Sequence, residues 1–347
     1  MKFLLLFFLS AFAISAQATI HTVSNDPDNP GQYTTVQAAH DAALPGDTLY
    51  ITPSETSYGN ISMNRRLIII GNGFVTEVDG TISKMTRIND IDLDESLVSS
   101  SSGSKFISII FRGMDAFEID NITIEQCGVE DRLTLSRCTN VTVKHSIVNL
   151  IDGSNGFFGV VSNCIFFSPQ RSNYTVKNCV IIGTGGYNSS GLFVDNVIFE
   201  NNIIIQYPVT ASNIQNTSFS NNIFFGMSGD PLPFDTNDNS GSGNLVGVNP
   251  QFVEYDIFSG VGDHSFTTPL VHVFDTEDWH LSSGSPGILY GTDGTDVGIY
   301  GGQDPWPEVS GYTGRPSMPV ITLFQLLNAV VSPDGELEFE IEATTQN

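Results

Sequence analysis

Short apolar runs alternate with polar corners through much of the chain. The clearest copies of this pattern span residues 196–205 and 216–225. Earlier copies span residues 121–129, 140–149 and 173–182, with a partial copy at 160–167. Each run holds three or four β-branched, aliphatic or aromatic residues, which is too few for a helix and typical of a strand. The pattern therefore predicts short β-strands joined by tight polar corners.

The copies align on one column of residues that follows the corner. Its members are Cys127, Ser146, Cys164, Cys179, Asn202 and Asn222, at spacings of 19, 18, 15, 23 and 20 residues. A fixed motif at a variable spacing near 20 residues is typical of a solenoid whose loops differ between coils. Scattered asparagines in an ordinary β-sandwich are the alternative, and they do not explain the shared frame.

The residue before this column is usually asparagine. The position is occupied by Gln126, His145, Asn163, Asn178, Asn201 and Asn221. Asparagine tolerates left-handed backbone geometry better than other residues with a side chain, and its amide can bond to neighbouring backbone. This position therefore predicts the corner of each coil. Stacked from coil to coil, its side chains are expected to form a hydrogen-bonded ladder.

A short helix is expected near residues 34–44. Thr34 or Thr35 can cap it, and Val36, Ala39 and Ala43 give it one apolar face, while Pro45 ends it. A strand is predicted over residues 49–51. Because the open end of a solenoid exposes an apolar interior, an amphipathic helix laid across that end covers it.

This N-terminal stretch resembles a known family. The helix followed by Pro45-Gly46-Asp47-Thr48, together with residues 58–63 and 66–73, resembles the N-terminal cap of the pectin-lyase-like right-handed parallel β-helix superfamily. Residues 278–302 resemble the closing coil of secreted bacterial members. The resemblance implies an all-β fold, namely a single right-handed parallel β-helix of about ten coils over residues 17–302.

Residues 303–347 are interpreted as a Pro/Gly-rich linker and a C-terminal β-hairpin. Residues 320–331 are apolar, and residues 336–343 alternate glutamate with apolar residues, as in a strand with one buried and one acidic face. Residues 332–335, Ser-Pro-Asp-Gly, supply the turn between them. The hairpin is expected to cap the C-terminal end of the solenoid, or alternatively to dock onto a partner.

The N-terminus predicts export. Residues 1–16 have the composition of a signal peptide, with Lys2 preceding the apolar run Phe3 to Ile14. No later stretch is long and apolar enough for a transmembrane helix, so no membrane insertion is expected after its removal. The protein is therefore expected in the periplasm, at the cell surface or outside the cell.

The charge balance excludes two classes of partner. The chain has 13 Lys+Arg against 38 Asp+Glu, a net charge of 13 − 38 = −25. Such a chain repels nucleic acid and anionic membranes. Export invites disulfides. However, Cys127, Cys164 and Cys179 share a column with serine and asparagine, which favours free thiols packed at an inner corner. The state of Cys138 is left open.

No catalytic residue is identified. The resemblance implies either a lyase, with a basic residue as proton acceptor, or a galacturonase with clustered aspartates. Lys144 and Lys177 share a column that looks like a solvated outer surface, and the Asn-Thr-Asp, Asp-Asp and Gly-His-Gly motifs are absent. The histidines at 264, 272 and 280 lie near aspartates at 263, 275 and 278, which suits metal binding or acid–base work, although a structural role is favoured.

Two sets of residues are candidates for binding. Asp235, Asn237 and Asn239 place oxygen atoms at alternate positions, as calcium loops do, although the glycine comes one residue late and no glutamate closes the loop. Calcium is thus the one cofactor considered, against an ordinary polar loop. For glycan stacking, the candidate aromatic residues are Tyr187, Tyr207 and Phe234.

Three functions are compatible with these features. The first is an exported, non-catalytic surface protein that binds polysaccharide or a surface protein. The second is a polysaccharide lyase or glycoside hydrolase of the superfamily, which requires two carboxylates, or a carboxylate and a base, within about 5–10 Å on one face. The third is an assembly component that docks through the exposed edge of its C-terminal hairpin.

Overall fold

The computed structural model describes ten segments of the chain. They are residues 18–72, 74–76, 82–93, 100–153, 156–183, 192–205, 208–254, 278–307, 319–326 and 339–345. The predicted signal peptide lies outside them. In the described part, no helix is long and apolar enough to cross a membrane.

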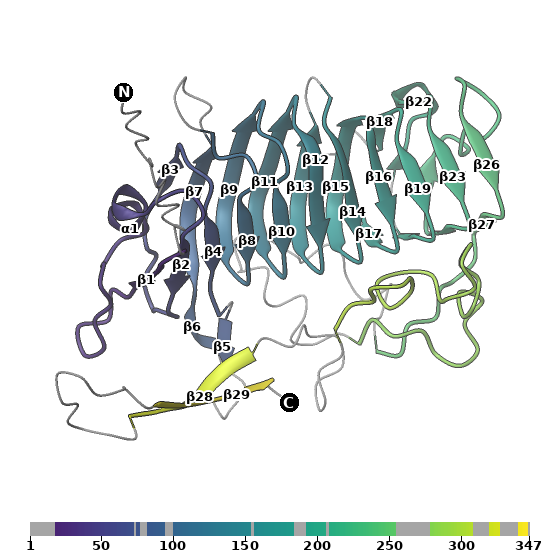
Figure 1. The fold of residues 1–347 in the computed structure, drawn as a ribbon. Helices are drawn as coiled ribbons and strands as arrows, with labels where there is room; N and C mark the ends of the chain where they lie inside the picture. Colours follow the sequence, from purple (N-terminus) through teal and green to yellow (C-terminus); the bar gives the residue numbers. More distant parts are fainter. Residues whose placement is uncertain are drawn as a thin grey trace, which may run out of the picture.

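Two long parallel sheets form the body of the molecule (Figure 1). The first has eleven strands, in the order β1 (Ile20–Val23), β2 (Thr48–Ile51), β4 (Ile68–Ile70), β8 (Lys105–Ile107), β10 (Thr123–Glu125), β12 (Thr139–Lys144), β14 (Phe158–Ser162), β16 (Tyr174–Lys177), β19 (Ile198–Glu200), β23 (Ser218–Ser220) and β26 (Ser240–Ser242). Successive coils thus add one strand each, and the predicted right-handed parallel β-helix is confirmed.

The second sheet has twelve strands. It contains β3 (Ile61–Met63), β7 (Arg87–Leu93), β9 (Ile110–Phe117), β11 (Gly128–Ser136), β13 (Ile147–Gly153), β15 (Ile165–Ser172), β17 (Val180–Ile182), β20 (Ile203–Ile205), β24 (Ile223–Phe225) and β27 (Leu245–Val246), with β18 (Phe193–Asp195) and β22 (Ile214–Gln215) beside them. Each copy of the sequence motif supplies one strand to each sheet.

Smaller elements complete the fold. They are η1 (Ala211–Asn213), the parallel pair β21 (Pro208–Val209) and β25 (Ser228–Gly229), the antiparallel pair β5 (Phe74–Thr76) and β6 (Ile82–Met85), and the antiparallel pair β28 (Pro319–Leu326) and β29 (Phe339–Thr345). The pair β28–β29 has the strand pairing predicted for the C-terminal hairpin. Its role as a cap or a docking element stays a prediction.

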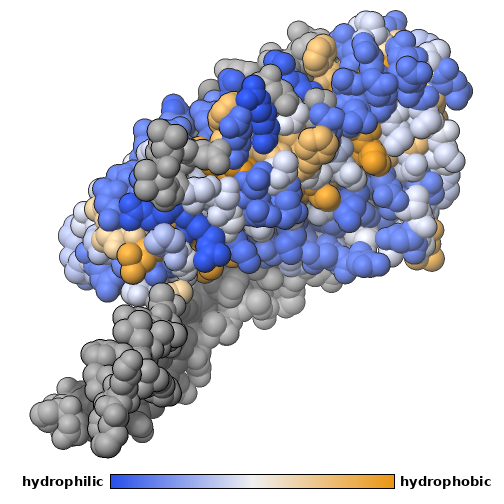
Figure 2. All heavy atoms as spheres, turned by 45° about the horizontal axis from the view of Figure 1, so that its top comes forward, coloured by the Kyte–Doolittle hydropathy of each residue, from blue (hydrophilic) through white to orange (hydrophobic). Residues whose placement is uncertain are grey.

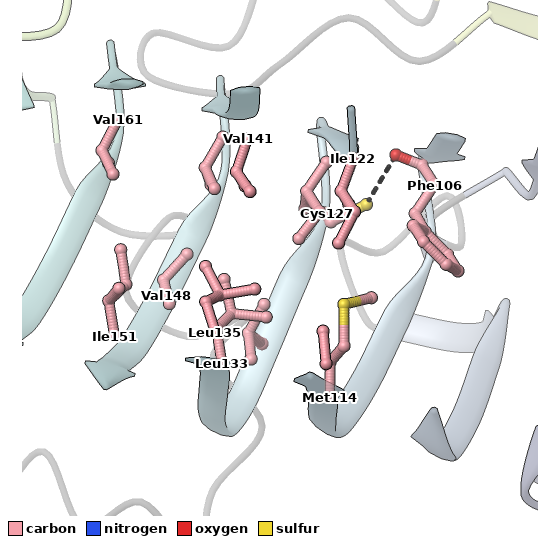
Figure 3. Packing of buried hydrophobic residues seen from close by; sticks show 14 of the residues in the cluster. Phe106, Met114, Ile122, Cys127, Leu133, Leu135, Val141, Val148, Ile151 and Val161 are labelled. Atoms are coloured by element: carbon pink, nitrogen blue, oxygen red, sulfur yellow. Dashed lines mark hydrogen bonds between the residues drawn. The ribbon is translucent and has the colours of Figure 1, made fainter. Parts of the chain in front are cut away.

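The interior is a continuous apolar column between the sheets. Phe106, Ile124, Val143 and Val161 occupy register-matched positions on successive strands, and all four are fully buried. Figure 3 shows such side chains stacked from coil to coil, with Met114, Leu133 and Ile151 facing them. Identical or similar apolar side chains in register give each coil the same contacts above and below, which stabilises the repeat by burial of apolar surface.

The predicted corners are confirmed. Gln126, His145, Asn163, Asn178, Asn201 and Asn221 all have positive φ, between 48° and 56°. A second corner also has left-handed geometry at the asparagine that begins each motif copy: Asn121, Asn140, Asn173, Asn196 and Asn216. Asparagine is favoured at both positions because it adopts this conformation at little cost.

The expected ladder lies one residue later than predicted. Buried Asn202 donates its backbone N–H and its Nδ2 to Asn222 Oδ1, each at 2.9 Å, and Asn222 donates in the same way to Asn244 Oδ1 at 3.0 Å. Ser146 and Cys179 replace these amides in earlier coils, accepting from Cys127 N at 3.1 Å and Cys164 N at 3.5 Å. We call this column, residues 127, 146, 164, 179, 202, 222 and 244, the inner ladder.

The predicted burial of the cysteines in this column is confirmed, and their thiols are free in this structure. Cys127, Cys164 and Cys179 are buried and form no disulfide. Burial raises the pKa of Cys127 to about 12, so this thiol stays protonated. Cys138 is also buried, and its thiol points at the carbonyl oxygens of Ala116 and Ser136.

The predicted N-terminal helix is α1 (Val36–Ala42). Thr35 caps it by accepting from Ala38 N at 3.2 Å, and Val36, Ala39 and His40 are its buried residues. The following Asp47 is buried, and its carboxylate accepts from Thr19 N and Leu44 N, each at 2.8 Å. This carboxylate ties Thr19, which precedes β1, to Leu44, two residues after the helix, so the Pro-Gly-Asp-Thr motif has a structural role.

Residues 278–302 differ from the expected closing coil. Apart from one bridge between Phe252 and Leu281, they form no β-pairing, and they run back along the outside of the second sheet (Figure 1). We call residues 287–306 the strap. The strap contacts the corner column in reverse order: Asn221 donates to Tyr290 O, Asn201 bonds to Thr292, Asn163 donates to Ile299 O and Gly301 O, and His145 contacts Asp304 O.

Apolar contacts hold the strap against the outer face of the second sheet. The second sheet carries an outward-facing apolar row that includes Ile147, Ile165, Val180, Ile203 and Ile223. These side chains are almost fully buried, and they form one cluster with Trp279, Val297, Ile299 and Trp306. The corner asparagines therefore face the strap instead of one another, which explains why the ladder is not in their column.

Candidate functional site

A row of outward-facing side chains crosses the second sheet outside the strap. It consists of Asp92 on β7, Asp115 on β9, Thr134 on β11, Asp152 on β13, Gln170 on β15 and Phe193 on β18, each the register partner of the next. We call these six residues the polar row. Neighbouring strands are about 4.8 Å apart, so the row presents one side chain per coil at a regular interval.

The strands hold the row rigidly because their other face is core. Ile91, Met114, Leu133 and Ile151 precede the row residues on successive strands and point into the apolar interior with at most 1% exposure. The alternation of side chains along a strand then fixes the next residue outward. The first four members of the row, Asp92, Asp115, Thr134 and Asp152, thus each stand between two apolar or small residues.

Most carboxylates on this face are paired with arginine. Arg87 Nη2 lies 2.5 Å from Glu130 Oε2, and Arg112 forms a two-pronged ion pair with Asp90. Arg171 Nε lies 2.9 Å from Asp152 Oδ1. Such two-pronged guanidinium contacts orient a carboxylate as well as neutralising it.

Asp92 and Asp115 are the exception. Within the described ranges, neither carboxylate has a basic partner. Partial burial raises the pKa of Asp92, and the negative charges of Asp115 and Asp90 raise it further. Neighbouring carboxylates that repel each other tend to share a proton, so one can donate a proton while the other accepts one.

A β-bulge shapes the neighbouring part of the face. The pairing of β11 with both β9 and β13 shifts register between Val129 and Arg132, which makes room for Glu130 and Asp131. Glu130 is largely buried beside Arg87, and its burial raises the pKa of its carboxyl more than Arg87 lowers it. Bulges re-aim side chains and are over-represented next to functional sites.

Exposed aromatic rings accompany the row. Phe193 ends it with 47% of its surface exposed, and Phe117 lies two residues beyond Asp115 on β9 with 49% exposed. The Arg137 guanidinium lies 5.1 Å from the centre of the Phe117 ring. The described part of the face shown in Figure 2 is mainly hydrophilic, with apolar side chains in small groups.

Of the aromatic residues predicted from sequence, Phe234 is the one that the structure describes. Phe234 packs its ring against Phe219 and Phe224, at centroid distances of 5.6 and 5.7 Å, and covers the end of the apolar column. Tyr187 and Tyr207 lie outside the described residues.

The predicted calcium loop uses its amides within the coil. Asn237 donates to Ala211 O at 3.0 Å. Asn239 accepts from Thr217 N at 2.9 Å and donates to Ile214 O at 2.8 Å, while Asp235 is exposed. The calcium proposal for these residues stays a prediction, and among the described residues no three His, Cys, Asp or Glu side chains form a group that could hold a metal ion.

The described members of the histidine–aspartate cluster and Lys144, which were also considered from the sequence, lie apart from the polar row. His280 Nδ1 lies 2.6 Å from Asp278 Oδ1, and the His280 ring stacks on Tyr300 at 3.8 Å, in the segment that leads into the strap. The other two histidines of the predicted cluster lie outside the described residues. Lys144 pairs with Glu125 at 3.1 Å and with Asp304 at 3.0 Å, so it fastens the strap at the outer surface.

Comparison with known proteins gives limited similarity. No protein-family model matches the chain, and no curated protein matches it significantly. Six chains of solved structures match, among them the pectin methylesterase from Aspergillus niger in a penultimately deglycosylated form. That alignment covers 67% of this chain and 91% of the esterase, with 13% identity and a TM-score of 0.29. The fold assignment rests on the strand pairing described above.

Proposed function

We propose that the protein binds an extended glycan along the polar row. The observation that carries this proposal is the register of six outward side chains on six neighbouring strands. Carboxylate, hydroxyl and amide groups bond to sugar hydroxyls, and the exposed Phe193 ring offers a surface against the apolar face of a sugar. A linear polymer lying across the strands meets a new side chain at each coil.

The charge of the face limits the glycan class. Among the residues that the structure describes, no basic side chain pairs with Asp92 or Asp115, and the whole chain has a net charge of −25. Like charges in a binding site cost several kcal/mol. The row therefore favours glycans without carboxylates over polyuronates.

A glycan array tests this proposal directly. Labelled protein is applied to neutral, amino-sugar and uronate polymers, with and without added calcium. Binding to neutral or amino-sugar polymers without calcium supports the proposal. Binding only to polyuronates, or to no glycan, contradicts it.

Acid–base turnover of the bound glycan is a second proposed function. The observation that favours it is the pair Asp92 and Asp115, register partners about 4.8 Å apart on neighbouring strands, with a raised pKa at Asp92. Side chains that leave neighbouring strands at this backbone spacing can place their carboxyl groups near the roughly 5–5.5 Å separation used by retaining glycosidases. Release of reducing ends from the array hits, abolished in Asp92→Asn and Asp115→Asn, supports turnover. If the polymer is unchanged after long incubation with wild type, the turnover proposal is contradicted and only glycan binding stands.

Export and docking are proposed on the sequence. N-terminal sequencing of the protein recovered outside the cytoplasm is expected to begin after residue 16 or 18. For the C-terminal strand pair, deletion of residues 308–347, which leaves the strap intact, is expected to abolish attachment to a surface partner if the pair docks, and to leave glycan binding unchanged.

A further inference from the structure

Two thiols of the inner ladder lie in consecutive coils. Cys164 and Cys179 precede the register partners Ile165 and Val180, so they occupy equivalent places in neighbouring coils. The Cys164 backbone N–H donates to Cys179 Sγ at 3.5 Å, which shows that the Cys179 side chain leans towards Cys164. Both side chains are fully buried.

This spacing suits a covalent link. Equivalent residues in neighbouring parallel strands lie about 4.8 Å apart, within the range of roughly 4.4–6.8 Å between the Cα atoms of disulfide-bonded cysteines. We propose that Cys164 and Cys179 are a latent disulfide site. Two thiols and one molecule of a small disulfide such as oxidised glutathione give the Cys164–Cys179 bond and two glutathione thiols, so the cysteines lose two electrons and two protons to glutathione.

The pairing is selective. In the inner ladder, Cys127 is followed in the next coil by Ser146, which accepts the Cys127 N–H, so Cys127 has no thiol beside it. Cys138 lies at another corner, where its thiol points at Ala116 O and Ser136 O. The structure thus singles out one pair among the four cysteines.

Burial decides when the bond forms. Thiol–disulfide exchange requires a thiolate that the oxidant can reach. In the folded chain both sulfurs are inaccessible, and burial together with the neighbouring Cys179 thiol raises the pKa of Cys164. The bond therefore forms while this coil is still open, and the folded protein keeps the redox state in which it closed.

The bond has a defined structural consequence. Residues 164 to 179 make up one complete coil, the one that includes β15 and carries Gln170 of the polar row. The disulfide would join the two ends of this coil into a covalent ring. It would therefore fix the position of one side chain of the row without adding a group to the surface.

Refolding in a glutathione buffer tests the proposal. The reduced, unfolded chain is refolded with reduced and oxidised glutathione, then denatured at low pH and analysed by thiol counting and peptide mapping. We expect two of four thiols to be lost and residues 164 and 179 to be linked. Four remaining thiols, a different pair, or glutathione adducts in place of the link would overturn the proposal.

Variants and a second reaction sharpen the result. Cys127→Ser is expected to lose two thiols, and Cys164→Ser to retain all three of its thiols. The wild-type peptide map decides the pairing even if a variant fails to fold. The same buffer added to reduced, already folded protein is expected to leave all four thiols intact, and oxidation there at the refolding rate would contradict the role assigned to burial.

Discussion

Asn222 is the central residue of the inner ladder, and its replacement by alanine tests how the coils are held together. Its side chain is fully buried. Its Oδ1 accepts from Asn202 N and Asn202 Nδ2, each at 2.9 Å, and its Nδ2 donates to Phe199 O and Asn244 Oδ1, each at 3.0 Å. Asn222→Ala removes all four hydrogen bonds and leaves the Asn202 N–H and the Phe199 carbonyl without these partners.

The expected loss of folding stability follows from these two unpaired backbone groups. A buried polar group left without a partner costs about 1–3 kcal/mol, so two backbone groups cost about 2–6 kcal/mol. A domain of this size shifts its Tm by about 2–4 °C per kcal/mol, so the melting temperature is expected to fall by roughly 4–24 °C. Asn222→Ser is expected to lose less, because Ser146 already accepts the equivalent N–H elsewhere in the ladder.

Urea unfolding followed by circular dichroism measures the effect. Ser220→Ala is the matched control, since Ser220 lies on the outer face of β23 in the same coil. If the free energies of unfolding of Asn222→Ala and Ser220→Ala differ by less than about 1 kcal/mol, the inner ladder does not stabilise the coils as proposed.

Three further changes test the strap, the cap and the core. Gly301→Ala would place a Cβ 1.7 Å from Asp296 O, so the strap is expected to detach and be cleaved faster in limited proteolysis, whereas Gly284→Ala, whose Cβ would meet only Gln251 Oε1 at 3.4 Å, is expected to behave as wild type. The pKa of Asp47 is lowered by hydrogen bonds from Thr19 N and Leu44 N against its partial desolvation, so its carboxylate stabilises the fold above about pH 4 and that contribution is lost as the pH falls through the lowered pKa. The stability gap between wild type and Asp47→Asn should therefore shrink below pH 4 in acid titrations, and a gap that stays constant would contradict it. Phe219→Ala removes a fully buried ring stacked 5.1 Å from Phe199, with an expected cost of about 3–5 kcal/mol in urea unfolding, and a cost under 1 kcal/mol would refute the packing described.

The corners were predictable because their signal is local. A left-handed backbone favours asparagine whatever the rest of the coil does, so the column from Gln126 to Asn221 could be identified from the aligned copies. The ladder was misplaced by one residue because Asn201 and Asn202 are both asparagines, and the inner position expected for the Asn202 column did not show which of the two bonds from coil to coil. The strap decides this, since it draws the Asn201 side chain outward to Thr292.

The polar row was not predicted because it depends on register between distant coils. The spacing between copies varies from 15 to 23 residues, and the bulge at Glu130 shifts the frame within one coil. A usable signal existed in the triplets around Asp92, Asp115 and Asp152, where a polar residue stands between two small or apolar ones. Their alignment required the strand pairing, which the sequence does not contain.

The affinity of Phe193→Ala for a glycan that binds wild type tests the central claim most directly. Phe158→Ala is the matched control, because Phe158 is exposed to 58% on the first sheet and Phe193 to 47% on the second. In isothermal titration calorimetry, we expect Phe193→Ala to weaken binding at least about tenfold, about 1.4 kcal/mol, and Phe158→Ala to bind as wild type does. Equal affinities for both variants and wild type would contradict a glycan site along the polar row.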